Sequence, residues 1–233
     1  MDISNPTNFR RTVAGAAMIA GPLVILVAEV LHAKFEMDAA KQLARVADNR
    51  DRWYAAHVLV LVALALAVPA YFGLVHLFRR ARPALAGLSL VVFVPGLVAL
   101  SAAAGMEFVV WQMAHPVRDT AEMVRLLDRV NESAGLIPLY LFLFLFPVAW
   151  LLAGIGLYLA RAVPAWVAVL TGVSLPVSFV VEFAGGPKAI VVIAQAAFAL
   201  GLVPIGLRVL RQSDAEWEEA RAASAAPAPE AVS

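Results

Sequence analysis

The sequence predicts an all-α membrane protein with six transmembrane helices, and three observations carry this prediction. Of the 233 residues, 62% are hydrophobic and only 15% are charged, whereas soluble domains average about 45–50% apolar and about 25% charged residues. Six apolar stretches are each long enough to cross a bilayer, which takes about 20 helical residues. The alternating pattern of a membrane β-barrel is missing from them, so helices are the spanning structure that this sequence favours.

In chain order, the expected spans are Thr12 to His32, Trp53 to Leu77, Leu85 to Met113, Ala134 to Ala160, Pro164 to Phe183 and Ala189 to Leu210. The first span is too long and apolar for a signal peptide, and five more follow, so we expect an uncleaved first helix. We therefore predict one transmembrane domain over residues 1–211. The remaining residues, 212–233, are rich in Ala, Glu and Pro and are expected to form a frayed or disordered tail.

Two connections on one face of the predicted bundle are long and charged, while those on the other face are very short. Within the long connections, Asp38–Asp48 and Asp119–Asn131 carry apolar residues at helical spacing. Asp119 or Thr120 is placed to cap the second segment. We expect both segments to form short helices at the membrane interface.

Six spans place both termini on one side of the membrane. Lys and Arg are divided nine to nine between the two faces, so their number does not set the orientation. On the short-loop face they are packed directly against helix ends, which favours that face as cytoplasmic. We expect a multi-pass protein of the cell membrane with both termini in the cytoplasm and with the lipid bilayer as its surroundings.

Composition also excludes several classes of site. A net charge of +1 gives no case for nucleic-acid binding, which needs a strongly basic face. Cysteine is absent, which removes disulfides, iron–sulfur clusters and thiolate metal sites.

Acidic, imidazole and aromatic side chains gather near the ends of the spans on the long-loop face. Glu29 and His32 are three residues apart on the first span, so they share a helix face. The other residues of this kind are Trp53, His57, Glu107, Trp111, His115, Tyr140 and Glu182. Because ionisable groups facing lipid are unfavourable, we expect the glutamates to point into the bundle or into a water-filled mouth.

Four interpretations of this group remain open. In the first, a pocket near the extracytoplasmic face binds a polar ligand or a divalent metal such as zinc or iron. Its carboxylate oxygens and imidazole nitrogens would come from Glu29, His32, His57 and Glu107, with His115 and Glu182 as further candidates. A membrane enzyme would use Glu29 or Glu107 as an acid or base on a lipid or isoprenoid-like substrate. For a bound ligand of either kind, the candidate contact residues are Trp53, Trp111, His115, Tyr140 and Glu182. A small transporter, expected as a homodimer, or an accessory subunit is the third, and ordinary interfacial placement of Trp, Tyr, His and Glu is the fourth.

Several local patterns resemble a known family. They are the segment Leu43–Asn49 before the second span, the aromatic run Leu141–Phe146 followed by Gly154, Gly156 and Tyr158, and Pro164-Ala165-Trp166 followed by Val169–Gly172. In these patterns and in its six-span layout, the chain resembles the bacterial integral-membrane family called domain of unknown function 4386. It departs from the family at Trp166 and Ala168, where a basic residue and a glycine are expected. The family has no agreed activity, so the resemblance implies a fold and no function.

Overall fold

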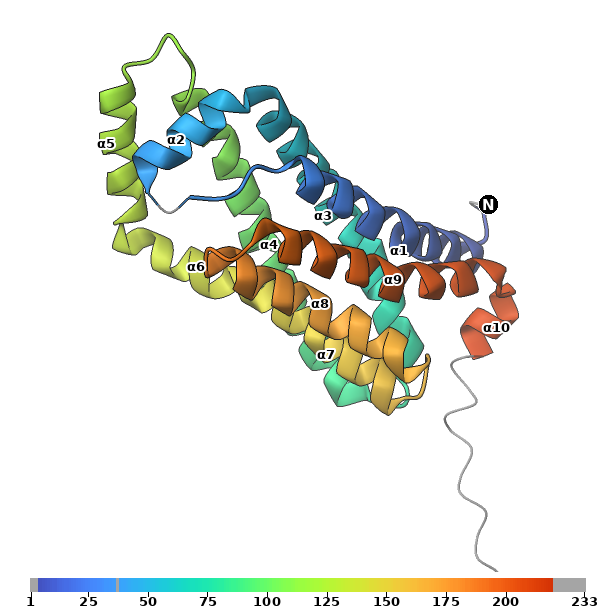
Figure 1. The fold of residues 1–233 in the computed structure, drawn as a ribbon. Helices are drawn as coiled ribbons and strands as arrows, with labels where there is room; N and C mark the ends of the chain where they lie inside the picture. The colour runs from blue at the N-terminus through green and yellow to red at the C-terminus, as the bar shows by residue number, and fades with distance from the viewer. Residues whose placement is uncertain (1–3, 37, 220–233) are drawn as a thin grey trace, which may run out of the picture.

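The computed structural model describes residues 4–36 and 38–219, and within these ranges the chain is α-helical with no β-strand. Six helical segments in this part are long and apolar enough to cross a membrane, which confirms the predicted polytopic all-α fold (Figure 1). Five of them are single helices: α1 (Pro6–Leu31), α3 (Arg50–Phe78), α4 (Pro83–Met113), α8 (Ala165–Phe183) and α9 (Lys188–Arg211).

The fourth span differs from the continuous helix that the sequence suggests. It consists of a 3-10 turn, η1 (Ala134–Leu136), followed by α6 (Ile137–Leu143) and α7 (Leu145–Leu159). The break lies at Phe144, three residues before Pro147. Proline has no N–H to donate to the carbonyl four residues earlier, and its ring crowds that carbonyl. The other spans keep an internal proline within a continuous helix, for example Pro22 in α1 and Pro95 in α4.

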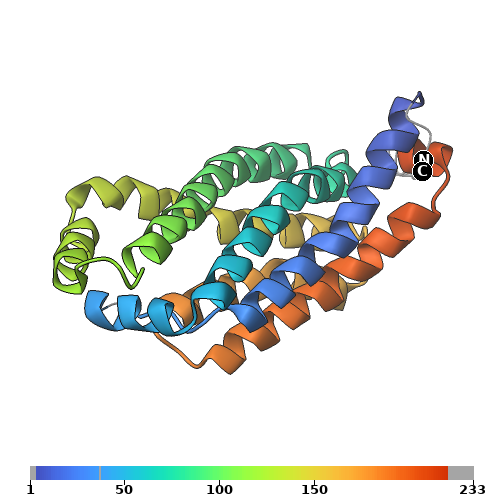
Figure 2. The same cartoon turned by 90° about the horizontal axis from the view of Figure 1, so that it is seen from above.

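The spans form a closed ring in chain order. Each span packs against the one before and the one after it, and the last, α9, returns to pack along α1 (Figure 2). Tyr71 of α3 ties three members of the ring together, because its hydroxyl donates to the carbonyls of Ser89 in α4 and Ala149 in α7. Its ring also stacks on Phe93 at 3.9 Å between centroids. The main hydrophobic core therefore lies between the spans, around this tyrosine.

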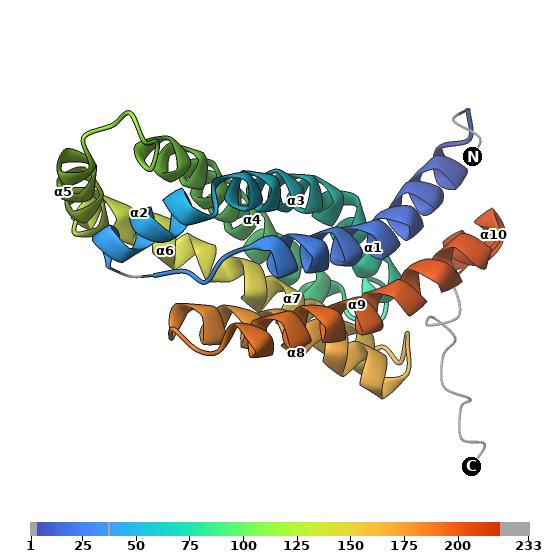
Figure 3. The same cartoon turned by 45° about the horizontal axis from the view of Figure 1, so that its top comes forward.

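The two long connections contain the helices expected there, α2 (Ala39–Asp48) and α5 (Thr120–Asn131). Asp38 caps α2 by accepting from the Lys41 N–H, and Asp119 caps α5 by accepting from the Glu122 N–H. Both helices lie at the end of the bundle away from the N-terminus (Figures 1 and 3). Their apolar faces meet Trp53, Val110 and Met113 in a second, smaller core. We call this end of the bundle the cavity end.

The opposite end, which we call the terminal end, holds the start of α1 and the end of α9. A short helix, α10 (Asp214–Glu219), follows α9 and packs against α1. Arg11 donates to Asp214 at 2.9 Å, and the Trp217 ring stacks on His76 at 4.1 Å. The predicted frayed tail thus begins with a docked helix, and residues 220–233 lie outside the described residues. Both termini of the membrane domain lie at one end, as an even number of spans requires.

Candidate functional site

A cavity of about 290 Å³ lies inside the ring and reaches from the cavity end toward the middle of the bundle. Its outer part is bordered by carboxylates, imidazoles and a phenol, and its inner part by aliphatic and aromatic side chains and a few buried polar groups. The outer residues include Glu29, His32, His57, Glu107, Tyr140 and Glu182, and the inner ones include Ala17, Ala67, Ala70, Trp150, Leu175, Phe198 and Leu202. The cavity therefore changes from polar to mainly apolar along its length. Along α1, the distance from Glu29 to Ala17 is about 18 Å at the helical rise per residue.

Four side chains from three helices form the polar cluster at the outer end: Glu29 and His32 of α1, Glu182 of α8 and Lys188 of α9. His32 is the residue that directly follows α1. The Lys188 ammonium contacts the Glu29 carboxylate directly, and its Nζ lies 3.9 Å from Oε2 of Glu182. These side chains are 16–24% exposed, so water screens the pair less than it would a surface ion pair. One lysine thus contacts two carboxylates from different helices.

Three members of the polar cluster could also hold a metal ion. One ligand atom each of Glu29, His32 and Glu182 lie within 4.8 Å of one another, and no other group of this kind occurs in the described ranges. One imidazole nitrogen and two carboxylate oxygens suit a borderline divalent ion such as zinc. The ammonium of Lys188 already lies against both carboxylates, so a metal would have to compete with it.

The sequence-predicted metal set comes together only in part. Glu29 and His32 converge as expected, but Glu182 completes the group, whereas His57 and Glu107 do not belong to it. His57 lies beside His32, with 4.9 Å between ring centroids, and its Nδ1 lies 2.8 Å from the Trp53 carbonyl oxygen. Both His57 and Glu107 line the same cavity. The Oε2 atom of Glu107 is buried and has no hydrogen-bond partner among the described residues.

Of the five residues predicted to contact a ligand, Tyr140 and Glu182 line the cavity. Trp53 is buried in the second core, and its ring packs against both His32 and His57. Trp111 lies under the guanidinium of Arg50 at 4.7 Å, and His115 accepts from the Val117 N–H in the loop before α5. These last three side chains are not among those that line the cavity.

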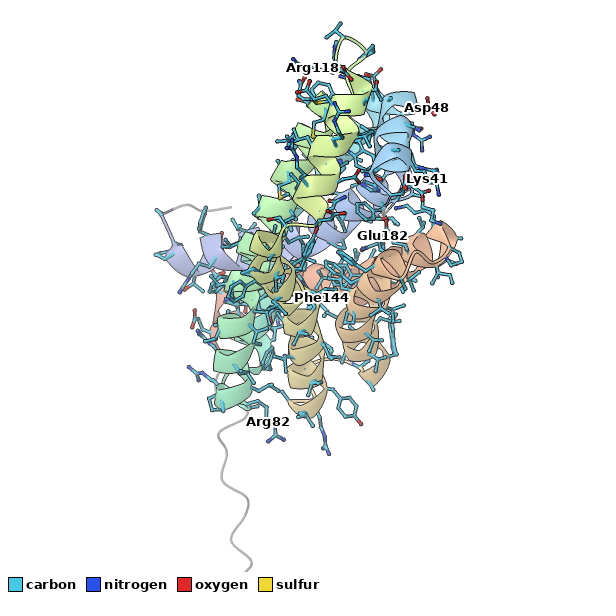
Figure 4. The ribbon with its side chains drawn as sticks, turned by 90° about the vertical axis from the view of Figure 1, so that its left-hand side faces the viewer. Lys41, Asp48, Arg82, Arg118, Phe144 and Glu182 are labelled. Carbon is cyan, nitrogen blue, oxygen red and sulfur yellow. The ribbon has the colours of Figure 1, made fainter. Side chains whose placement is uncertain are left out.

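The cavity approaches the side of the bundle where α6 and α8 face each other. Figure 4 shows Phe144 and Glu182 at neighbouring positions of this side, with Arg82 at the opposite end of the bundle. The rings of Phe144 and Phe183 meet here at 5.2 Å between centroids, and both side chains are about two-fifths exposed. Phe183 and Tyr140 line the cavity from this side. Two contacting aromatic rings therefore lie beside the outer part of the cavity on this side.

Three polar residues deeper in the cavity, Ser178, Gln195 and Trp150, were not predicted from the sequence as site residues. Gln195 of α9 is 4% exposed and donates through Nε2 to Ser178 Oγ at 3.0 Å. Trp150 of α7 is 2% exposed, and its indole lies across from Phe198. A lone amide within the 24 apolar-rich residues of α9 was the available signal for Gln195. Nothing in the sequence distinguishes Trp150 from other buried aromatic residues.

Comparison with known proteins adds no assignment to this geometry. No protein-family model, no curated protein and no solved structure matches the chain.

Proposed function

We propose that the cavity binds an amphiphilic ligand taken from the membrane, with the polar part of the ligand at the polar cluster and its apolar part between the spans. The observation that carries the proposal is the change of lining along one continuous cavity, from Glu29 and Glu182 at one end to Ala70 and Leu202 at the other. Ligand sites are mostly apolar cavities with a few convergent polar groups that fix orientation. This cavity has that composition, and its position inside six apolar helices suits a ligand dissolved in lipid.

The charges of the cluster favour a particular kind of polar group. Glu29 and Glu182 offer carboxylate oxygens, Glu107 adds another carboxyl group, and the Lys188 ammonium contacts the first two. Carboxylates accept hydrogen bonds and attract cations, and they repel phosphate and carboxylate groups. The ligand that fits carries a primary amine or a hydroxyl at its polar end.

The α6–α8 side supports a route from the bilayer. Phe144, at the junction of α6 and α7, and Phe183, at the end of α8, meet on this side beside the cavity. Rotating one aromatic side chain breaks fewer packing contacts than separating two continuous helices would. A ligand arriving within the membrane would therefore pass between α6 and α8.

A test uses the purified protein in lipid nanodiscs and three radiolabelled single-chain probes of equal length, which end in an amine, a carboxylate or a phosphate. We expect the amine to bind saturably and at least tenfold more tightly than either anionic probe. Glu29→Gln and Glu182→Gln should each weaken amine binding about tenfold. Glu36→Gln, which alters an ion pair with Arg45 outside the cavity, is the matched control. Equal binding of all three probes, or no effect of the cluster variants, would contradict the proposal.

A second candidate function, divalent-metal binding, is favoured by the convergence of Glu29, His32 and Glu182 within 4.8 Å. Because Lys188 and a metal ion would compete for the same carboxylates, Lys188→Met should raise zinc affinity, and Glu29→Gln in that background should remove it. Metal content after dialysis against zinc measures both. Zinc at the same level in Lys188→Met and in the double variant would exclude this candidate.

The enzymatic interpretation depends on Glu107. Its buried Oε2 has no hydrogen-bond partner within the described part of the chain, and the residue lines the cavity. A group that exchanges a proton with a bound ligand must lie at such a site. This interpretation requires that the wild-type protein converts a bound lipid. It also requires that Glu107→Gln still binds the lipid but no longer converts it.

A further inference from the structure

A second polar level lies inside the cavity, below the polar cluster. Ser178 is four residues from Glu182 on α8, and Gln195 is seven residues from Lys188 on α9. At the helical rise per residue, these side chains lie about 6–10 Å below the cluster. Trp150 of α7 borders the cavity as well, and its ring lies 4.8 Å from that of Phe198, three residues after Gln195 on α9. Three helices therefore bring polar groups into a part of the cavity that is otherwise apolar.

The polar atoms at this level are only partly satisfied. Gln195 donates to Ser178, but its Oε1 is buried and has no hydrogen-bond partner among the residues that the structure describes. The indole Nε1 of Trp150 is also buried and has no hydrogen-bond partner among these residues. If the Gln195 amide is turned over, its nitrogen takes the place of the oxygen, so one polar amide atom stays unpaired in either orientation. Such atoms are unfavourable in an apolar interior unless a partner completes them.

We infer that Gln195, Ser178 and Trp150 form a second subsite that binds a hydroxyl group on the chain of the amphiphilic ligand. A hydroxyl fits because it both donates and accepts: it can donate to Gln195 Oε1 and accept from Trp150 Nε1. A second charged group does not fit, because the described residues that border this level offer no opposite charge. The inference rests on the proposed function, since the polar end of the ligand must lie at the polar cluster to place the hydroxyl here.

The cavity volume limits the rest of the ligand. About 290 Å³ corresponds to the volume of on the order of ten water molecules in the liquid, and hence to about ten methylene-sized groups. About ten such groups are enough for one chain, so the ligand class is a single-chain amphiphile with an amine or hydroxyl at one end and a hydroxyl on the chain.

The test compares two radiolabelled single-chain amines of equal length, one unmodified and one with a hydroxyl about 8 Å from the amine, a spacing set by the helical rise. In wild-type protein in nanodiscs, we expect the hydroxylated amine to bind at least tenfold more tightly. Gln195→Met, which keeps the length of the side chain and removes its polar atoms, should bring the ratio of affinities close to one. Trp150→Phe should reduce the same ratio by a smaller factor. Gln112→Met, at the exposed end of α4, is the matched control and should leave it unchanged.

The outcomes separate the two proposals. If both amines bind equally well, and both lose affinity in Glu29→Gln, the second subsite is refuted while the amphiphile site stands. If neither amine binds saturably, the proposed function itself fails. A preference for the hydroxylated amine that survives both Gln195→Met and Trp150→Phe would also overturn the subsite, because the hydroxyl would then be recognised elsewhere. Binding of the unmodified amine by Gln195→Met shows that this variant is folded.

Discussion

The terminal end and the cavity end of the bundle are built from the same kind of apolar helix, yet they pack differently. In the terminal half, glycines let helix backbones touch: a Cβ on Gly154 of α7 would lie 2.5 Å from the Cα of Gly172 in α8. A Cβ on Gly73 of α3 would lie 2.5 Å from Cβ of Ala14 in α1. These distances are far below van der Waals contact, so only glycine permits the observed approach. Small residues at such contacts are how membrane helices associate closely.

At the outer part of the cavity end, ionisable groups join the helices. Glu29, Glu182 and Lys188 connect α1, α8 and α9 there by charge. Side-chain ion pairs keep helices further apart than glycine contacts do. The comparison teaches that the cavity follows from where the small residues are placed, since helices that are in close contact at one end can diverge toward the other.

The largest expected effect comes from disturbing the glycine contacts. Gly154→Leu places a large side chain against the backbone of Gly172 and the carbonyl of Ala168, where neither neighbour can rotate away. Overpacking of this kind destabilises by about 1–3 kcal/mol, and contact with backbone places this variant near about 3 kcal/mol. Reversible unfolding in mixed detergent measures the change in the free energy of unfolding.

Matched substitutions test whether the two ends really differ. Ala104→Leu adds a side chain of the same final size toward the cavity, and Gly105→Leu adds it on the outer face of α4, where no atom lies within 4 Å of the new Cβ. Both should change the free energy of unfolding by less than about 1 kcal/mol. A loss at Ala104 as large as that at Gly154 would mean that the cavity end is packed as tightly as the terminal end.

The second effect concerns the charges of the cavity end. Lys188→Met leaves the carboxylates of Glu29 and Glu182 close together without their ammonium. Breaking a fully buried pair costs about 3–5 kcal/mol, and breaking an exposed pair about 0–1 kcal/mol. With side chains 16–24% exposed, we expect about 2 kcal/mol of destabilisation, an intermediate value between those two limits.

A double-mutant cycle isolates this interaction from the loss of lysine packing. Glu29→Gln combined with Lys188→Met should be less destabilising than the sum of the two single variants, because the double variant leaves fewer unpaired charges. Lys41→Met on the exposed surface of α2 is the control. Strict additivity of the two single variants would show that the pair contributes nothing to stability.

The sequence was sufficient for the membrane fold because length and hydropathy act locally. The six spans, and the helices that begin after Asp38 and Asp119, follow from apolar runs and caps that are visible in a single stretch of chain. The terminal helix α10 was missed because the composition of residues 212–233 as a whole suggests a solvated tail, whereas its docking depends on contacts of Trp217 and Asp214 with α3 and α1.

The site was predicted less well because it depends on helix rotation and tilt, which one sequence does not fix. Glu29 and His32 share a helix face, so their convergence was accessible from their spacing. The choice between Glu182, His57 and Glu107 as their neighbour depends on how α8, α3 and α4 are turned about their axes. Gln195 and Trp150 were overlooked for the same reason, since a polar atom becomes informative only when its surroundings leave it unpaired.

The smallest expected effect lies at the terminal end, in the cap of α10. The Glu216 carboxylate accepts hydrogen bonds from the N–H and the hydroxyl of Ser213. The Glu216 N–H in turn donates to Ser213 Oγ at 3.2 Å. This arrangement is known as a capping box. These hydrogen bonds lower the pKa of the Glu216 carboxyl below its ordinary value of 4.5. A lowered pKa in the folded state means that the stabilisation is present above the ordinary pKa and is lost as pH falls through the pKa of the folded state.

Wild-type α10 should therefore exchange its amide hydrogens more slowly than Glu216→Gln at pH 7, and the difference should shrink progressively below about pH 4.5. Amide exchange across Asp214–Glu219 measures this, and a difference between the two proteins that does not change with pH would assign the slower exchange to the docked Trp217 and not to the cap.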